Sequence, residues 1–368
     1  MVKRVMILAG GTGGHVYPAL AVARELLEAG HEVVWMGTRK GLEAKVVPAA
    51  GIPIEWLSVS GIRGKGWQGL LKAPFMLVRA FLQSLAIVWR VRPQVALGMG
   101  GFVSGPGGLV ARCLGVPLIL HEQNRIPGTT NRWLARWATV VLEAFPGSFP
   151  ARVGAIACGN PLRREIAGLA GKTRDRIWNP SLPLRVLVVG GSLGAKGLNE
   201  IVPAALARVG VPMEVRHQTG EAMRVETRDR YDRLGLKAEV TAFLEDMADA
   251  YAWAHLAICR SGAMTVSELA AAGLPAVLVP YPHAIDDHQT ANALFLVESG
   301  ASELLPQSRL TAESLASIIQ GWLDSPDKLA EMGKCAHGLA APEAASLVAN
   351  LCLGKARIQT REQRHEND

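Results

Sequence analysis

His15 follows a glycine-rich stretch, Gly10-Gly11-Thr12-Gly13-Gly14, that comes directly after the apolar run 5–9. So many glycines leave backbone N–H groups that an anionic group could approach closely. If residues 5–9 form a parallel strand, this stretch lies at its carboxyl end, where open α/β sheets bind ligands. Two interpretations follow. The stretch is either a phosphate cradle beside a reactive histidine, or a tight turn in which His15 caps a helix.

Polar residues follow two further predicted strands. Residues 98–108 form a second glycine-rich turn after the strand expected at 94–98. The tetrapeptide His121-Glu122-Gln123-Asn124 follows the strand expected at 116–120. Because the carboxyl ends of parallel strands share one edge of a sheet, we expect both segments to line one wall of a cleft with the first turn.

A different glycine precedes the predicted helix 263–272. The free N–H groups and positive dipole end of that helix, behind Gly262, suit a phosphate or diphosphate. Glu268 lies about one turn inside it, where a carboxylate could accept hydrogen bonds from a sugar diol or simply be solvated. Ser192, in the turn 190–192, and Arg163 are further candidates for phosphate contact.

Other chemistries find little support. His283, Asp286, Asp287 and His288 are ligand-type residues without an established metal spacing, so we expect a solvated loop and no metal site. Neither a nucleophile elbow nor the P-loop pattern occurs. The dinucleotide fingerprint can be forced onto the first turn, but Arg39 and Lys40 stand where its acidic residue belongs.

Two segments share one design and thereby indicate two α/β domains. R-V-M-I-L-A-G-G-T-G at 4–13 and R-V-L-V-V-G-G-S-L-G at 185–194 both read as a strand followed by a glycine turn. We expect two similar domains that present their strand ends to a shared cleft, with a linker within 161–184. Further helices and strands are expected at 19–29, 32–37, 213–217, 240–243, 256–259 and 276–279, and a helix from about Thr290.

Composition limits the setting. The chain has 368 residues and five cysteines without a C-x-x-C pair, so neither a disulfide framework nor a zinc site is indicated and a reducing cytoplasm is expected. The apolar run 5–9 is too short for a signal peptide. The most apolar later window, 102–120, contains glycines, prolines and Arg112, which excludes an uninterrupted spanning helix.

The formal net charge is +7 and is unevenly placed, because the segment between Glu55 and Glu122 contains seven basic residues and no acidic one. An acid-free basic segment indicates an anionic partner. Aliphatic and aromatic residues are interleaved with the charges, which favours a membrane surface over a nucleic acid, although each apolar residue could instead belong to the core. We predict that the segment from Trp67 to Phe81, with Lys72 and Arg79, contacts anionic lipid.

Taken together, six motifs resemble the MurG family, the N-acetylglucosaminyltransferases of bacterial peptidoglycan synthesis. They are A-G-G-T-G-G-H-V (9–16), G-M-G-G-F-V-S-G-P-G-G (98–108), H-E-Q-N (121–124), G-N-P-L-R (159–163), G-G-S-L-G-A (190–195) and C-R-S-G-A-M-T-V-S-E (259–268). The resemblance runs from about residue 4 to about 350. It implies a GT-B fold, in which two Rossmann-like domains with parallel sheets face a central cleft.

The resemblance also implies a reaction. N-acetylglucosamine would pass from UDP-N-acetylglucosamine to the C4 hydroxyl of undecaprenyl-diphosphoryl-N-acetylmuramoyl pentapeptide (lipid I), with inversion, giving lipid II. A general base removes the hydroxyl proton, and His15 is our candidate because a histidine titrates near neutral pH. Glu122 is expected to support it, and the amides of the first turn are expected to face the lipid diphosphate.

The family's donor contacts carry over residue by residue. Uracil is placed near Leu244, the diphosphate near Ser192 and the helix after Gly262, and the ribose hydroxyls near Glu268. The full set of predicted donor-binding residues is Thr12, Gly13, Gly14, Asn124, Arg163, Ser192, Leu244, Ala263, Met264, Thr265, Val266, Ser267, Glu268 and Gln289. This chain departs from the family's pattern at His288, where a glutamine is frequent, and in the loop 284–287.

The implied organisation assigns residues 1–160 to acceptor binding and membrane association, with a helix of about 341–356 packing back on them. Residues 161–340 would bind the donor, and 357–368 would form a poorly ordered tail. The implied partners are UDP-N-acetylglucosamine, lipid I, the anionic cytoplasmic face of the cell (inner) membrane and cell-wall synthesis proteins. No nucleic acid, metal or cofactor is expected. A GT-B transferase for another acceptor and a non-catalytic nucleotide-sugar binding protein remain alternatives.

Overall fold

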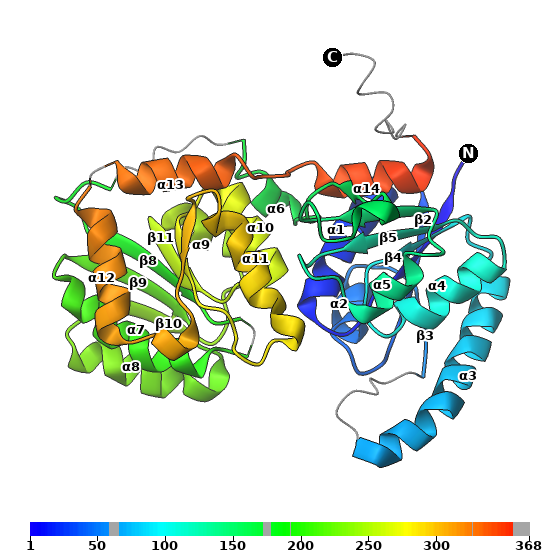
Figure 1. Cartoon of the computed structure of the whole chain (residues 1–368), viewed down its shortest axis with the longest axis horizontal. Coiled ribbons are helices and arrows are strands. Elements are labelled where there is room, and N and C mark those ends of the chain that lie inside the picture. The colour runs from blue at the N-terminus through cyan, green and yellow to red at the C-terminus, as the bar shows by residue number, and fades with distance from the viewer. Residues whose placement is uncertain (59–65, 172–177, 192, 326, 356–368) are drawn as a thin grey trace. The chain divides into compact units, whose positions relative to one another are not determined.

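The computed structural model describes residues 1–58, 66–171, 178–191, 193–325 and 327–355, with the side chains of 66–74 and Ile285 outside the description. The chain divides into two compact units (Figure 1). Unit 1 is formed by Met1–Arg163 with Glu343–Asp368, and unit 2 is formed by Arg164–Pro342. The predicted Ser192 contact and the predicted tail 357–368 lie outside the described residues.

Unit 1 is built on a seven-stranded parallel sheet with the order β3-β2-β1-β4-β5-β6-β7. Strand β1 lies centrally, pairing Arg4 with Glu32 of β2 and Val5 with Val95 of β4. The chain therefore winds outwards first to one side and then to the other, as in doubly wound folds. The strands are β1 (Arg4–Leu8), β2 (Glu32–Gly37), β3 (Ile54–Trp56), β4 (Val95–Gly98), β5 (Leu118–Glu122), β6 (Val140–Glu143) and β7 (Ile156–Ala157).

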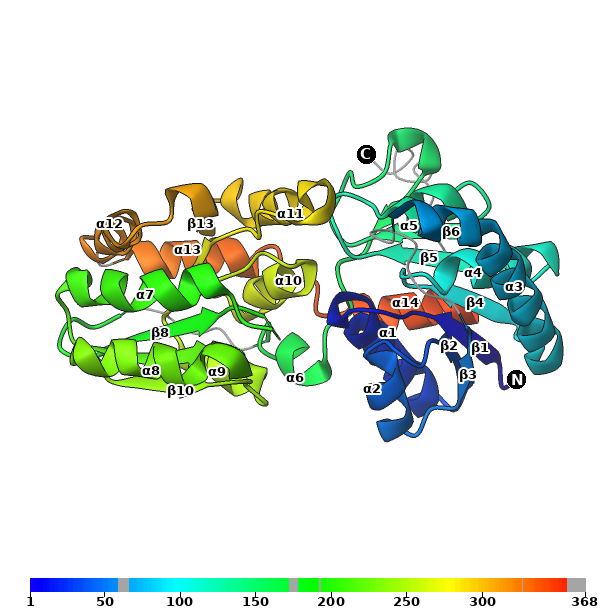
Figure 2. The same cartoon turned by 90° about the horizontal axis from the view of Figure 1, so that it is seen from below.

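Alternate residues of β1 feed the two faces of this sheet. Val5 and Ile7 join the cluster that includes residues of α1 and α14, whereas Met6 and Leu8 join the cluster that includes residues of α3, α4 and α5. Both faces are thus covered, which explains why residues 5–8 of the strand are all apolar. Figures 1 and 2 show α14 beside α1. The helices are α1 (Gly13–Glu28), α2 (Glu43–Ala49), α3 (Gly66–Val91), α4 (Ser104–Cys113), α5 (Thr129–Leu134) and α14 (Ala344–Leu353), with a short 3₁₀ turn at Ala151–Val153.

Unit 2 contains a six-stranded parallel sheet with the order β10-β9-β8-β11-β12-β13. Strand β8 is central here, pairing Leu184 with Met213 of β9 and Val186 with Leu256 of β11. The strands are β8 (Leu184–Val189), β9 (Met213–Gln218), β10 (Ala238–Thr241), β11 (Leu256–Cys259), β12 (Ala276–Leu278) and β13 (Ser302–Leu304). The two parallel sheets confirm the predicted fold class of two Rossmann-like α/β domains.

The helices of unit 2 surround this sheet. Val186 and Val188 of β8 pack in one cluster with Leu198 of α7 and Ile319 of α12, and α12 lies beside α7. The helices are α6 (Arg164–Ala167), α7 (Lys196–Val209), α8 (Arg224–Arg233), α9 (Met247–Trp253), α10 (Ala263–Ala272), α11 (His288–Val297), α12 (Ala312–Leu323) and α13 (Lys328–His337), with 3₁₀ turns at Glu221–Met223, Ile285–Asp287 and Gln307–Arg309.

Several predicted boundaries were wrong. Helix α1 begins at Gly13 rather than near Pro18, because Thr12 in an extended conformation forms the N-cap and its carbonyl accepts from Val16 N–H. Pro18 is tolerated inside the helix at the cost of one backbone hydrogen bond. Strand β5 extends to Glu122 instead of ending at 120. Helix α11 begins at His288, before the predicted Thr290. The prediction for α10 is confirmed.

Candidate active site

His15 is the third residue of α1, so it lies in the first helical turn directly after the Gly10-Gly11 turn. Its Nδ1 lies 3.4 Å from Thr12 Oγ1. On the other side the ring lies against Gly100, where an added Cβ would come within 2.8 Å of His15 Nε2. The half-buried imidazole is therefore held by its own helix start and by the second glycine turn.

The two glycine turns of unit 1 contact each other through backbone atoms. Gly100 and Gly101 have φ of +96° and +82°, which favours glycine, and a Cβ on Gly101 would collide with the carbonyl oxygen of Gly10. The buried Ser104 hydroxyl accepts from Gly100 N–H at 3.0 Å and lies 2.7 Å from the carbonyl oxygen of Leu8 in β1. This hydroxyl joins the second turn to the strand that precedes the first.

Glu43, the first residue of α2, places a buried carboxylate against the first glycine turn. Glu43 Oε2 accepts from Gly11 N–H at 2.9 Å, and Oε1 accepts from Thr38 N–H at 2.9 Å and Thr38 Oγ1 at 2.7 Å. Its side chain is fully buried. Because Gly11 N–H already donates to this carboxylate, the expectation that the amides of this turn face a phosphate does not hold for Gly11.

The polar corner at 121–124 differs from the prediction. His121 and Glu122 belong to β5 and are buried, so they do not form an exposed edge. Burial lowers the pKa of His121 to about 4, which keeps the ring neutral near pH 7, and its Nε2 bonds to Gly159 O. Glu122 accepts from Asn124 N–H, Gly128 N–H and Asn131 Nδ2 at 2.9–3.1 Å. Through these hydrogen bonds the Glu122 carboxylate fixes the loop that follows β5.

Two residues predicted to contact the sugar nucleotide, Asn124 and Arg163, follow β5 in the chain. Asn124 Nδ2 donates to Glu122 Oε1 at 3.3 Å. Arg163 is the last residue of the main segment of unit 1, and its guanidinium lies 5.7 Å from the centre of the Tyr17 ring on α1. The intervening Asn160 is buried and donates to Gln123 O at 3.1 Å. The segment 159–163 is thereby attached to the corner.

In unit 2 the glycine turn after β8 is supported by a neutral network. A Cβ on Gly194 would collide with Thr219 O. Asn199 Nδ2 donates to this same carbonyl at 3.0 Å, and Asn199 Oδ1 lies 3.1 Å from His217 Nε2. His217 Nδ1 lies 3.0 Å from the Tyr231 hydroxyl, and burial lowers the pKa of the histidine to about 3.

Helix α10 offers an N-terminus without a carboxylate in its first turn. Gly262 forms the N-cap and has no side chain to accept from the first N–H groups, so this end suits an anion. Ala263 and Val266 are buried, and Val266 N–H donates to Gly262 O at 3.0 Å. Met264, Thr265 and Ser267 are partly exposed.

Glu268 and Leu244 lie on neighbouring elements of unit 2. Glu268, in the second turn of α10, accepts from the hydroxyl of Tyr251 in α9 at 2.8 Å. That contact orients the carboxylate. Leu244 is partly buried in the segment between β10 and α9. The residue before it, Phe243, is 54% exposed, so an aromatic face accompanies the predicted uracil contact.

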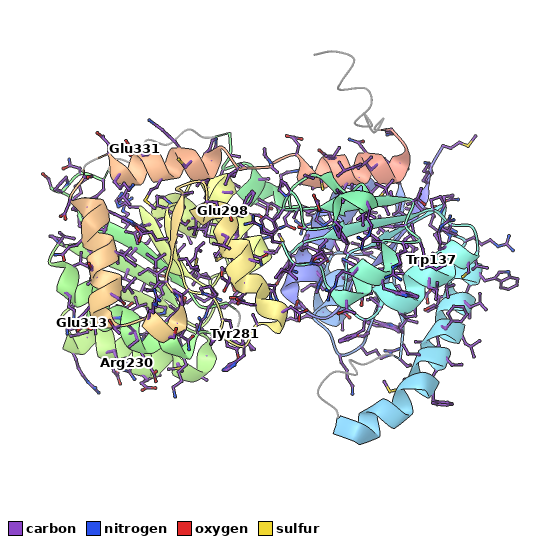
Figure 3. The ribbon with its side chains drawn as sticks, in the orientation of Figure 1. Trp137, Arg230, Tyr281, Glu298, Glu313 and Glu331 are labelled. Atoms are coloured by element: carbon purple, nitrogen blue, oxygen red, sulfur yellow. The ribbon has the colours of Figure 1, made fainter. Side chains whose placement is uncertain are left out.

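Arg260 lies inside a quoted motif but was not among the predicted site residues. Its Nη1 donates to Val279 O and Pro280 O at 3.0 and 2.9 Å, and its guanidinium lies 5.7 Å from the ring centre of Tyr281 (labelled in Figure 3). Gln289 Oε1 accepts from Tyr281 N–H at 2.8 Å. Arg260 and Gln289 therefore hold the segment after β12 from both sides.

Metal ligation finds no support in the part of the chain that the structure describes, where no group of three His, Cys, Asp or Glu side chains is arranged to hold an ion. In the loop predicted to be solvated, Asp287 Oδ1 accepts from Thr290 Oγ1 at 2.7 Å. Among the described residues, moreover, no helix has the length and apolar character needed to cross a membrane.

Comparison with known families decides the classification. The N-terminal domain model of glycosyltransferase family 28 matches residues 5–143, and the C-terminal domain model of the same family matches residues 185–348. The chain belongs to glycosyltransferase family 28. The N-terminal family 28 model covers His15 and Glu122, the C-terminal model covers Glu268 and Gln289, and Arg163 lies between the two.

Within family 28 the chain is similar to full-length relatives. It is 62% identical to a Methylococcus capsulatus protein, over 97% of this chain and 99% of the relative. It is 54% identical to an Alkalilimnicola ehrlichii protein, over 97% of this chain and all of the relative. Both relatives are named as UDP-N-acetylglucosamine–N-acetylmuramyl-(pentapeptide) pyrophosphoryl-undecaprenol N-acetylglucosamine transferases.

Solved structures support the same classification. The crystal structure of Acinetobacter baumannii MurG is 41% identical, covers 96% of this chain and 99% of its own, and superposes with a TM-score of 0.82. The calicheamicin glycosyltransferase CalG4 has 18% identity, 96% and 99% coverage and a TM-score of 0.66, which shows a shared fold alone. The chain is thus a family 28 glycosyltransferase with the GT-B type of domain architecture, and its predicted resemblance to the MurG family is confirmed.

Proposed function

We propose that this chain transfers N-acetylglucosamine from UDP-N-acetylglucosamine to the C4 hydroxyl of lipid I, with inversion at the anomeric carbon, and so forms lipid II. The observation that carries the proposal is the near full-length similarity to family 28 relatives named for this transfer. The alternatives are a related transferase for another acceptor and a nucleotide-sugar binding protein without activity.

In the proposed mechanism His15 is the general base. It takes the proton of the C4 hydroxyl while that oxygen attacks the anomeric carbon, and UDP leaves from the opposite face. The position of His15 in the first turn of α1, held by Thr12 and Gly100, supports this role. Glu122 acts in the proposal through the loop after β5, which its carboxylate braces.

The nucleotide part of the donor is proposed to bind through unit 2. The diphosphate lies against the Gly190–Gly194 turn and the N-terminus of α10, whose N–H groups stabilise the departing charge. Glu268, oriented by Tyr251, takes the ribose hydroxyls. We propose that no metal or other cofactor is required, so treatment with a chelator should leave the rate unchanged.

A transfer assay tests the function. Radiolabelled UDP-N-acetylglucosamine is incubated with the purified chain and a lipid I analogue, and product is separated by chromatography. Labelled lipid II analogue is the expected product. Binding of UDP without transfer to any acceptor would identify a binding protein, and transfer to other acceptors but not to the lipid I analogue would identify the related transferase.

The proposed location is the cytoplasmic face of the cell (inner) membrane, where the chain would bind peripherally and meet cell-wall synthesis proteins. Support comes from α3, on which Phe75 and Trp89 are 74% and 68% exposed and Arg79 is also exposed. Trp137, close in sequence to α5, is 51% exposed (Figure 3). Exposed aromatic side chains beside positive charge suit an anionic lipid surface. The side chains of Trp67 and Lys72 lie outside the described residues, and Phe81 is partly buried against the core.

Co-sedimentation with liposomes that contain anionic lipid tests this location. The double variant Phe75→Ser with Lys72→Glu should bind much less than the unmodified chain, because it loses apolar contact and reverses a charge. A matched control is Val225→Ser with Lys237→Glu in unit 2, where Val225 is 67% exposed. Unchanged binding by the α3 variant would contradict the proposed membrane contact.

A further inference from the structure

Gly11 is held through both of its backbone groups by two consecutive residues at the start of α2. Its N–H donates to Glu43 Oε2 at 2.9 Å, and its carbonyl accepts from Leu42 N–H at 3.2 Å. Gly11 has φ of +99°, and a glycine-rich segment has little conformational preference of its own. These two hydrogen bonds therefore fix the backbone immediately before Thr12 and His15.

The second oxygen of Glu43 connects this turn to the sheet. Oε1 accepts from the N–H and the hydroxyl of Thr38, the residue that follows β2. A continuous series of contacts thus runs from the end of β2 through Glu43 to Gly11, and then by the chain to the N-cap Thr12 and to His15. The carboxylate supplies the two acceptors that this series needs.

Three glycines leave the space that this carboxylate occupies. A Cβ on Gly10 would lie 2.6 Å from Oε1, a Cβ on Gly37 would lie 2.8 Å from Cγ, and a Cβ on Gly41 would collide with the carboxyl group itself. Burying a charged group is unfavourable unless it is hydrogen-bonded. Here three donors and the first turn of α2 stabilise the negative charge.

We propose that Glu43 is a positioning residue of the transfer reaction, because by fixing Gly11 it fixes the N-cap Thr12 and thereby sets the position of His15 relative to the acceptor. The inference rests on the proposed role of His15. It predicts that weakening Glu43 impairs the transfer step more than it weakens donor binding, because most of the predicted donor-binding residues lie in unit 2. Glu43 itself does not contact the reacting atoms in this proposal.

Glu43→Gln is the main test variant. Glutamine has the same shape but only one acceptor oxygen, so its NH₂ group must face either Gly11 N–H or Thr38 N–H. With saturating UDP-N-acetylglucosamine, kcat for a lipid I analogue should fall on the order of 10- to 100-fold, the loss expected for a misplacement of about 1 Å. The KM for the donor should change by less than about twofold, because the predicted uracil and ribose contacts lie in unit 2.

Glu143→Gln provides a matched control. Glu143 is also a nearly buried carboxylate of unit 1, and its two oxygens accept from Gly147 N–H at 2.8 Å and Phe149 N–H at 3.0 Å. The same substitution should therefore lower Tm to a similar extent and leave kcat unchanged. Equal losses of kcat in both variants would show a purely structural effect and overturn the proposal.

Thr38→Val provides a second variant if Glu43→Gln does not fold. It removes the hydroxyl that donates to Glu43 Oε1 and retains the hydrogen bond from Gly11 N–H to Oε2. We therefore expect kcat to fall several-fold and the donor KM to stay unchanged. An unchanged kcat in a folded Glu43→Gln, or in Thr38→Val where that variant alone folds, overturns the proposal. Failure of the unmodified chain to transfer would instead overturn the proposed function.

Discussion

The glycine turns after β1 and β8 share one local sequence design and differ in what holds them. In unit 1 a buried carboxylate, Glu43, binds Gly11, and a second glycine turn packs backbone against backbone. In unit 2 the neutral series Tyr231–His217–Asn199 ends on Thr219 O, against which Gly194 packs.

This difference bears on which ligand each turn suits. A negative charge bound to the first turn would repel a diphosphate brought close to Gly11, at a distance where screening is weak. The network in unit 2 carries no such charge, and α10 adds a helix N-terminus. The comparison therefore supports donor phosphates in unit 2 and a role of the first turn in placing His15.

The largest expected effect comes from His15→Ala. If His15 is the general base, kcat should fall on the order of 100-fold or more, whereas affinity for UDP should remain because the predicted uracil and ribose contacts lie in unit 2. Steady-state transfer kinetics and calorimetric UDP titration measure the two quantities. A folded variant with near-normal kcat would remove His15 as the base and with it the functional contrast between the turns.

A smaller effect is expected from Gly194→Ala. Its φ is +76°, and the added Cβ would collide with a backbone carbonyl that cannot move away easily, so UDP affinity should fall at least about tenfold, which is 1.4 kcal/mol. The matched control is Gly210→Ala at the end of α7, where φ is +77° and nothing lies within 4 Å of the added Cβ. Gly210→Ala should lower stability slightly and leave UDP binding intact. Equal affinity losses would argue against a donor role of the turn.

The smallest effect concerns pH. The pKa of His217 is about 3 in the folded chain against 6.5 when unfolded, so the unfolded chain binds a proton first as pH falls. The free energy of unfolding should therefore decrease between pH 6.5 and about 3, and this contribution is fully present only above pH 6.5. His121 contributes likewise in unit 1 between pH 6.5 and about 4.

Urea unfolding of the unmodified chain and of His217→Gln at pH 7 and pH 5.5 isolates this contribution. The unmodified chain should lose about 1 kcal/mol more than the variant on acidification, since one pKa unit corresponds to about 1.4 kcal/mol. Identical losses of unfolding free energy would show that burial in unit 2 does not hinder protonation of His217.

Much of the fold could be predicted, because apolar runs that end in glycine or polar residues are a local signal. Strands β2 and β11 and helix α10 were predicted with their observed bounds. The bounds of α1 were not, because Pro18 suggested a helix start while the extended Thr12 provided the N-cap. Helix α2, which carries Glu43, was not predicted at all, because seven residues give too short a pattern.

The sequence by itself determined the two-domain α/β architecture, the family and the set of residues that could act on a sugar nucleotide, since these depend on motifs that are continuous in the chain. Only the tertiary structure decided which of those groups are available. It buried His121 and Glu122 within β5 and attached Glu43 to Gly11. Hydrogen bonds between segments distant in sequence set the charge and the conformation of each glycine turn, and no local pattern records them.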